Sequence, residues 1–266
     1  MKPAACHTLV TGASMGIGKA IAADFAASGE NLVLVARSRT LLEELAASLV
    51  SEYGIDVRVC SEDLGEPGGP GRVFEYCSKQ GLVIDRLVNC AGFSVVGSFV
   101  RIPRAELHQM AMVNMVALAE MTRLFLPAMI DRRKGTVVNI ASLAAFQGVP
   151  GMGLYSATKS FVVTLTEALD AEIRGSGVRV FAVCPGFIDN DQFYNRAGHD
   201  RKRILVPISE PRVVIKAMRR GLISGSVVVM PTLFDRLMVF TQRVLPRRLV
   251  VMLAGYFAGA GEKLSS

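Results

Sequence analysis

Residues 11–18 are TGASMGIG, and they join a short apolar segment to a helical pattern that begins at Gly16. Gly12, Gly16 and Gly18 stand where the backbone must turn tightly and approach a ligand, which glycine permits because it has no Cβ. Free N–H groups and the positive end of the helix dipole favour a bound pyrophosphate here. Because the turn lies between a strand and a helix, we predict dinucleotide binding rather than an ordinary βα turn. The contacts expected from this turn are Gly12, Ser14, Gly16, Ile17 and Gly18.

Short apolar runs alternate with longer helical patterns along the rest of the chain, which is typical of a parallel sheet covered by helices on both faces. The predicted strands are residues 7–10, 31–36, 56–60, 86–89, 135–140, 178–183 and 226–230, and the predicted helices are residues 16–28, 40–53, 106–130, 155–174 and 212–223. We therefore expect a single doubly wound, Rossmann-type α/β domain with a seven-stranded, mainly parallel sheet. The length of 266 residues fits one such domain.

Two segments stand apart from this alternating pattern. Residues 187–211 are long, polar and irregular, so we predict a lid over the substrate. We assign residues 1–231 to a dinucleotide-binding and catalytic domain, and residues 232–266 to an amphipathic helical extension of it. The extension carries apolar residues and four arginines, which leaves three environments open for it: the domain's own core, a partner subunit or a membrane surface.

Composition limits the classes of protein that the chain can belong to. A hydrophobic fraction of 51% excludes a disordered chain. The net charge is +7, but the basic residues form short groups without interleaved aromatics, so we expect no nucleic-acid binding. Five cysteines without a CxxC pair and three histidines without ligand spacing predict no metal site. The odd cysteine number, the short stretch before the first strand and the absence of a long apolar run favour a cytoplasmic protein.

The end of the second predicted strand carries a basic residue. An acidic residue at this position would bind the ribose 2′-hydroxyl of NAD, whereas this chain has Ala36 followed by Arg37. An arginine pairs with the 2′-phosphate of NADP through charge-assisted hydrogen bonds. We therefore predict NADP as the cofactor, with a solvated helix start as the alternative for Arg37. Asp63 and Leu64, after the third strand, are expected beside the adenine, although Asp63 is nearly as well suited to a helix N-cap.

The strongest local pattern is Tyr155-Ser156-Ala157-Thr158-Lys159. Residues four apart share one face of a helix, so Tyr155 and Lys159 can act on one another. An ammonium about 5 Å from the phenol, at an effective dielectric of about 20, would favour tyrosinate by roughly 3 kcal/mol. We therefore expect Lys159 to lower the pKa of Tyr155 into the range of a general acid/base.

Several motifs occur together in a fixed order. They are the TGxxxGxG turn, the NCAG run at residues 89–92, Asn114, Ser142, the YxxxK pair, and Pro185-Gly186. In this order and spacing the chain resembles the short-chain dehydrogenase/reductase family over about residues 5–231. The resemblance implies that Tyr155 is the general acid/base, that Lys159 also binds the nicotinamide ribose, and that Ser142 binds the substrate oxygen. It implies further that Asn114 holds a water that relays protons to the lysine.

The same resemblance implies the remaining cofactor contacts. Asn89, Ala91 and Gly92 would form the floor of the adenosine pocket, with Cys90 where many relatives have a second asparagine. Pro185 and Gly186 would lie beneath the nicotinamide, and the backbone at Ile188 would bind its carboxamide. The chain departs from the family at Asn190, where relatives often have threonine, and at Met15, where many NADP users have a basic residue.

The substrate side is less specific in sequence. Apolar residues expected around it are Phe93, Val95, Phe146, Val149, Met152, Phe187 and Phe193. They favour a small apolar carbonyl or alcohol substrate, converted by an NADP-dependent oxidoreductase, although each of these residues would fit the ordinary core equally well. The alternative is a catalytically silent dinucleotide-responsive binding protein, which would need the glycine turn but not Tyr155, Lys159 and Ser142. An apolar stripe along residues 110–128 indicates core or subunit interface, and we expect a homo-oligomer.

Overall fold

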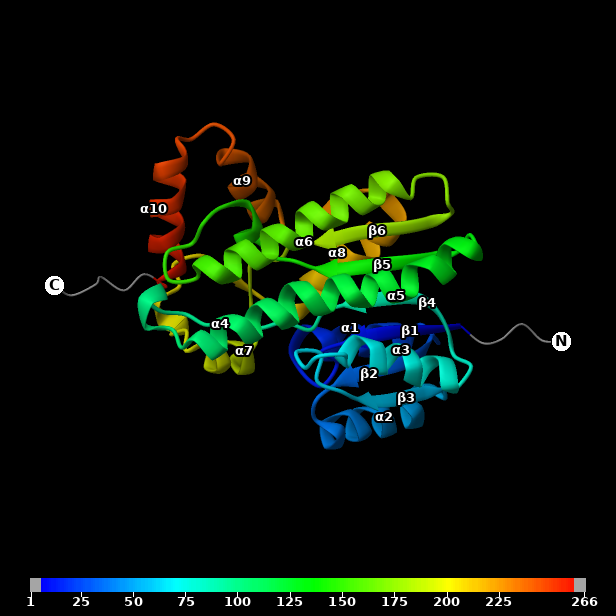
Figure 1. The fold of residues 1–266 in the computed structure, drawn as a ribbon. Coiled ribbons are helices and arrows are strands. Elements are labelled where there is room, and N and C mark those ends of the chain that lie inside the picture. Colours follow the sequence, from blue (N-terminus) through cyan, green and yellow to red (C-terminus); the bar gives the residue numbers. More distant parts are fainter. Residues whose placement is uncertain (1–5, 261–266) are drawn as a thin grey trace.

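Seven parallel strands form the centre of the computed structural model, which describes residues 6–260 (Figure 1). The strands are β1 (Cys6–Thr11), β2 (Asn31–Ala36), β3 (Val57–Ser61), β4 (Val83–Asn89), β5 (Gly135–Ile140), β6 (Val178–Val183) and β9 (Val228–Val229). Their order is β3-β2-β1-β4-β5-β6-β9, and every neighbouring pair in this sheet is parallel. The predicted doubly wound, seven-stranded sheet is therefore confirmed.

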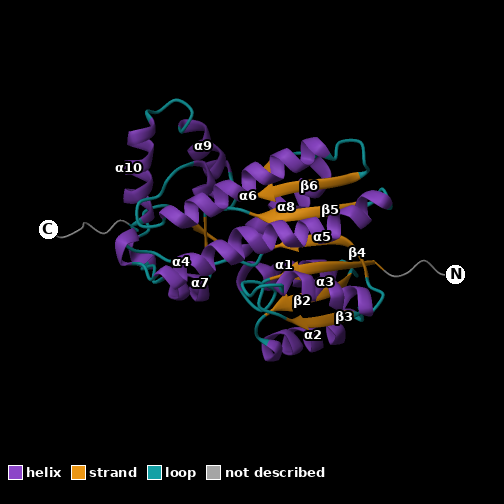
Figure 2. Ribbon diagram, in the orientation of Figure 1, coloured by secondary structure: helices purple, strands orange, loops and turns teal. Residues whose placement is uncertain are grey.

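Helices cover both faces of this sheet (Figure 2). On one face lie α1 (Gly16–Ala27), α2 (Arg39–Tyr53) and α8 (Pro211–Ser224), which bury Phe25, Leu42 and Met218 with the strands. On the other face lie α3 (Gly69–Lys79), α5 (Leu118–Asp131) and α6 (Gly153–Glu172), with Phe125 in the core between them. Burial on both sides explains why the strands are continuous apolar runs without alternation.

The helix predicted over residues 106–130 is not a continuous α-helix. It begins as α4 (Arg104–Ala111), passes through a π-helical turn at Met112–Ala117 and continues as α5. The whole stretch has the length and apolarity of a membrane span, but α5 packs on β4 and β5 as a core helix. The π turn contains Asn114, and such turns often mark functional sites.

Residues 187–211 are more regular than predicted. They contain β7 (Phe187–Ile188), α7 (Asp191–Ala197), a short 3-10 turn at Arg201–Arg203 and β8 (Ile208–Ser209), with β7 and β8 paired in parallel. His199 in this segment is buried, and its Nε2 atom lies 2.8 Å from the carbonyl oxygen of Ala258. This segment is therefore held to the C-terminal helix.

The C-terminal segment forms two helices, α9 (Leu233–Thr241) and α10 (Arg247–Ala258). A capping box between Thr232 and Asp235 starts α9, and Pro246 precedes α10. Figure 1 shows this hairpin at the end of the molecule toward which the strands point, beyond the carboxyl ends of the sheet. Ligands of doubly wound sheets bind at that end, so the hairpin is placed beside the predicted site.

Candidate active site

One cavity of about 670 Å³ runs from the glycine turn, past the carboxyl ends of β1, β4 and β5, to α9 and α10. Most of the predicted site residues line it. They are Gly12, Ser14, Ile17, Gly18, Arg37, Asp63, Leu64, Ala91, Gly92, Ser142, Tyr155, Lys159, Pro185, Gly186 and Ile188. Folding thus brings together motifs that are up to 176 positions apart (residues 12 and 188) in one cavity.

The glycine turn has the properties needed to hold a pyrophosphate. Gly12 has a φ of +67°, and a Cβ at Gly18 would lie 2.2 Å from the carbonyl oxygen of Gly12, so the turn can form only with glycine at these positions. Helix α1 has no side-chain cap and no acidic residue in its first turn. Its first N–H groups therefore remain available to an anion, and the residues present fit the phosphates of a dinucleotide.

Arg37 lies at the adenosine end of the cavity, after β2. Its side chain is 71% exposed, and its Nη1 atom is 3.9 Å from a carboxylate oxygen of Asp63. The other Asp63 oxygen accepts a hydrogen bond from the backbone N–H of Gly65. Asp63 therefore orders its own turn and leaves the guanidinium of Arg37 free to move toward a phosphate.

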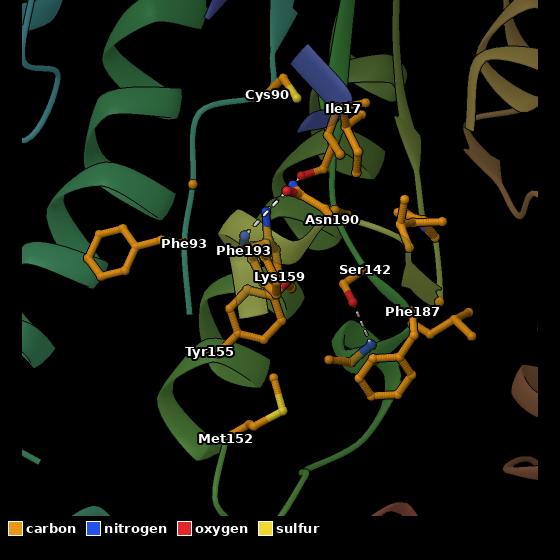
Figure 3. A pocket seen from close by; sticks show the side chains of 18 of the residues that line it. Ile17, Cys90, Phe93, Ser142, Met152, Tyr155, Lys159, Phe187, Asn190 and Phe193 are labelled. Atoms are coloured by element: carbon orange, nitrogen blue, oxygen red, sulfur yellow. Dashed lines mark hydrogen bonds between the residues drawn. The ribbon is translucent and has the colours of Figure 1, made fainter. Parts of the chain in front are cut away.

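Tyr155, Lys159 and Ser142 meet at the centre of the cavity (Figure 3). Ser142 follows β5, and its hydroxyl oxygen accepts a hydrogen bond from the backbone N–H of Ala144 at 3.1 Å. The Ser142 side chain also acts to lower the pKa of Tyr155, against the larger effect of burial. The Lys159 ammonium donates to the carbonyl oxygen of Ile140 at 2.8 Å and lies 5.8 Å from the Tyr155 ring centre. Both side chains are buried, with Tyr155 at 8% and Lys159 at 6% exposure. One face of α6 thus holds the pair against the end of β5.

We predicted that the pKa of Tyr155 is lowered, but in the structure it is raised. Burial raises the pKa of Tyr155 to about 12, and it lowers the pKa of Lys159 to about 8. The prediction from spacing treated the pair as partly solvated, whereas desolvation disfavours the charged form of both groups. Tyr155 is consequently a protonated phenol at neutral pH, which suits it to donate a proton.

Asn114 and Asn89 lie behind the cavity wall rather than on it. Asn114 accepts from the backbone N–H of Phe93, and it donates to the Phe93 carbonyl oxygen and the Thr158 hydroxyl. A Cβ at Gly92 would lie 3.0 Å from the Asn114 amide oxygen, so any larger residue here would press on that oxygen. The Asn89 amide donates to Thr122 and to Asn139 in a buried network. The Asn89 side chain is thus held in this network and does not line the cavity, and a contact of this residue with the adenosine stays a prediction.

Asn190 joins the lid segment to the glycine turn. Its side-chain oxygen accepts from the backbone N–H of Phe193 at the start of α7. Its amide nitrogen lies against Gly16, where a Cβ would be 2.2 Å away. Gly16 itself does not line the cavity, because Asn190 covers it. At this position, where relatives often have threonine, the amide oxygen is already used by the helix cap.

The sequence patterns did not reveal that α9 and Gln147, directly after η3 (Leu143–Phe146), contribute to the polar wall. Asp235 is 6% exposed, and one of its oxygens accepts from Thr232. The other oxygen would be 2.8 Å from a Cβ at Gly186. Gln147 and Gln242 also line the cavity, each with a buried amide oxygen that has no hydrogen-bond partner among residues 6–260. These acceptors could bind donor groups of a ligand, but no local motif marks them.

The apolar wall agrees in large part with the predicted set. Phe93, Val149, Met152, Phe187 and Phe193 line the cavity. Val95 and Phe146 do not line it. Further apolar residues come from the C-terminal helices, namely Phe234, Met238, Leu245, Val250, Leu253 and Phe257. The chain therefore offers a long apolar wall next to the polar Tyr155 cluster.

A dinucleotide cradle beside a buried tyrosine, lysine and serine places the chain in the class of nucleotide-binding oxidoreductases. The model of the short chain dehydrogenase family matches residues 6–200. The chain belongs to the short-chain dehydrogenase/reductase family, whose members use a nicotinamide cofactor. The predicted resemblance is confirmed.

The chain is similar to several characterised relatives. It is 35% identical over 184 residues to the very-long-chain 3-oxoacyl-CoA reductase-B of Danio rerio, and it covers 58% of that protein's length. A short-chain dehydrogenase from Sphingobium yanoikuyae in complex with NADPH superposes with a TM-score of 0.80 at 32% identity, over 90% of this chain and 94% of the other. The bulky-bulky ketone specific alcohol dehydrogenase from Comamonas testosteroni gives 0.75 at 28% identity, over 90% and 93%.

Proposed function

We propose that this oxidoreductase uses NADPH to reduce the ketone of a long apolar substrate, with a 3-oxoacyl thioester as the leading candidate class. The observation that carries the proposal is the buried Tyr155, which lines one cavity together with Ser142 and Lys159, next to an apolar wall built from two separate parts of the chain. The similarity to a very-long-chain 3-oxoacyl-CoA reductase and to a bulky-ketone alcohol dehydrogenase supports a large ketone. Because the chain spans 58% of the first relative, the thioester itself is part of the proposal.

In the proposed reduction, Ser142, Tyr155 and Lys159 each have a separate role. Ser142 donates a hydrogen bond to the ketone oxygen, and Tyr155 gives that oxygen its phenolic proton. Lys159 is an ammonium below pH about 8, and it reduces the cost of the negative charge left on Tyr155. The bound cofactor, held by the glycine turn and Arg37, supplies the hydride. Asn114 acts indirectly, since it fixes the backbone of Phe93 beside α6.

A panel of ketones tests this function through the absorbance of NADPH. We expect kcat/KM to rise with acyl chain length by about fourfold for each buried methylene, because each contributes about 0.8 kcal/mol, until the apolar wall is filled. Aldehydes, alcohols and short ketones serve as the comparison set. Binding of NADPH without turnover of any member would contradict the proposal and favour a silent binding protein.

Arg37→Ala tests the choice of cofactor. We expect wild-type protein to bind NADPH at least about tenfold more tightly than NADH, and the substitution to remove most of that difference, because a charge-assisted contact contributes about 1.5–3 kcal/mol. The matched control is Arg39→Ala, since Arg39 pairs with Glu43 and does not line the cavity. Fluorescence titration measures both affinities. Equal affinities of the wild type for the two cofactors would contradict the assignment.

A further inference from the structure

Helices α9 and α10 each carry apolar residues on two sides. One side of each helix lines the cavity, with Met238 and Leu253 as examples. The other side is open to solvent in the described chain, with Leu233 at 80%, Val244 at 69% and Tyr256 at 65% exposure. We call this open side the hairpin face. Its apolar members are Leu233, Leu237, Phe240, Val244, Met252 and Tyr256.

All exposed charged residues of the hairpin face are basic. Its charged members are Arg236, Arg243, Arg247 and Arg248, all of them exposed. None of these arginines forms an ion pair with another described residue, whereas Arg212 and Arg219 elsewhere on the surface do. The single acidic residue within 231–260 is Asp235, which is buried on the cavity side. Four arginines without an ion pair in the described chain thus lie on the same hairpin as the exposed apolar side chains.

We propose that the hairpin face docks on an anionic lipid bilayer, so that the enzyme takes its apolar substrate from the membrane. Apolar side chains of such a helix enter the boundary between headgroups and acyl chains, and arginines around them bind lipid phosphates. Soluble monomers rarely expose an apolar patch of this kind. The part of the proposal that concerns substrate delivery rests on the proposed function, while bilayer binding does not.

The charge pattern favours a bilayer over a second copy of the chain. Two copies meeting through this face would bring their arginines together without an exposed carboxylate to pair with them. Such like-charge contacts oppose association. A nucleic acid would pair with the arginines but leave the apolar residues in water. An anionic bilayer satisfies both sets of groups at once.

The rim of the cavity lies on the same hairpin. Phe234 and Leu245 line the cavity and are also exposed, at 39% and 37%. Cavity lining and exposed surface thus meet at these two residues, Phe234 in the first turn of α9 next to Leu233, and Leu245 after the helix next to Val244. A lipid-like substrate could pass there from the bilayer to the apolar wall without crossing water.

Vesicle co-sedimentation tests the proposal with the full chain. The wild type is expected to bind vesicles of phosphatidylcholine and phosphatidylglycerol more tightly than vesicles of phosphatidylcholine alone, with binding weakened by salt. Arg236→Gln combined with Arg243→Gln should weaken binding to the anionic vesicles by about thirtyfold, at about fivefold per arginine. Leu237→Gln combined with Phe240→Gln should lower binding to both kinds of vesicle by at least about tenfold.

Matched controls lie at the far end of the molecule. Arg174→Gln changes an exposed arginine at the end of α6, and Ile223→Gln changes an apolar residue that is 87% exposed on α8. Both should bind vesicles like the wild type. The hairpin variants should keep wild-type reduction of a short, water-soluble ketone, because none of the four positions lines the cavity. Ketone reduction and vesicle binding are thus measured independently of each other.

Three outcomes would overturn the proposal. The first is wild-type protein that does not sediment with anionic vesicles. The second is an equal loss of binding in the Arg174 or Ile223 variant, which would make the attraction nonspecific. The third is a fall in oligomer mass of the Leu237 and Phe240 variant without any change in vesicle binding, which would assign the hairpin face to a second copy of the chain.

Discussion

Tyr155→Phe is expected to lower kcat/KM for ketone reduction by about 10²–10⁴-fold, which is the contribution of a positioned proton donor. The substitution removes one oxygen and leaves the edge contact between the rings of residues 155 and 193 possible, so packing is retained. NADPH affinity should stay close to that of the wild type, because the glycine turn and Arg37 are untouched. Steady-state kinetics and a fluorescence titration of NADPH measure the two quantities.

Tyr76→Phe is the matched control for this substitution. Tyr76 lies on α3, is partly buried and does not line the cavity, so the same loss of a hydroxyl should leave turnover unchanged. Turnover of Tyr155→Phe within a few-fold of the wild type would show that another group supplies the proton. Loss of NADPH binding together with turnover would instead indicate a damaged cavity, which thermal unfolding would reveal.

Lys159→Met should lower kcat/KM for reduction by about 100-fold. The substitution keeps an unbranched side chain of similar length and removes the charge. A unit charge 5.8 Å from the Tyr155 ring centre, at an effective dielectric of about 20, contributes about 3 kcal/mol to the charge that develops there. Cofactor affinity should also fall if Lys159 binds the nicotinamide ribose. Lys134→Met is the control, since Lys134 pairs with Asp85 outside the cavity.

The pKa of Lys159 also predicts how kcat/KM for reduction depends on pH. Burial lowers the pKa of Lys159 to about 8, so the ammonium predominates below that pH and is lost above it. We expect kcat/KM for reduction by the wild type to be constant toward pH 7 and to fall as the pH rises through about 8. The fall should be absent in Lys159→Met, which has no group to titrate. A flat wild-type profile up to pH 10 would mean that the charge of Lys159 does not matter.

Short local motifs were sufficient to predict the fold class and the family. The glycine turn, the Tyr155–Lys159 spacing and the alternation of apolar runs with helical patterns are each contained within a few neighbouring residues. Backbone geometry turns such spacings into positions directly, so the fold class and the family followed from sequence. The bounds of the weakest elements did not, since β9 pairs through only Val228–Val229 of the predicted residues 226–230. A strand at the sheet edge has one neighbour, and its length depends on that neighbour.

Properties that depend on residues far apart in the sequence are determined only by the tertiary structure. The pKa of Tyr155 is raised because several elements exclude water from it, and a spacing of four on a helix contains no information about that burial. Asp235 reaches Gly186 and the hairpin lines the cavity because α9 folds back over the carboxyl ends of the strands. Asn89, part of a recognised motif, faces Thr122 and Asn139 instead of the cavity. Short-range geometry is encoded by adjacent residues, whereas burial and side-chain partners result from the packing of the whole chain.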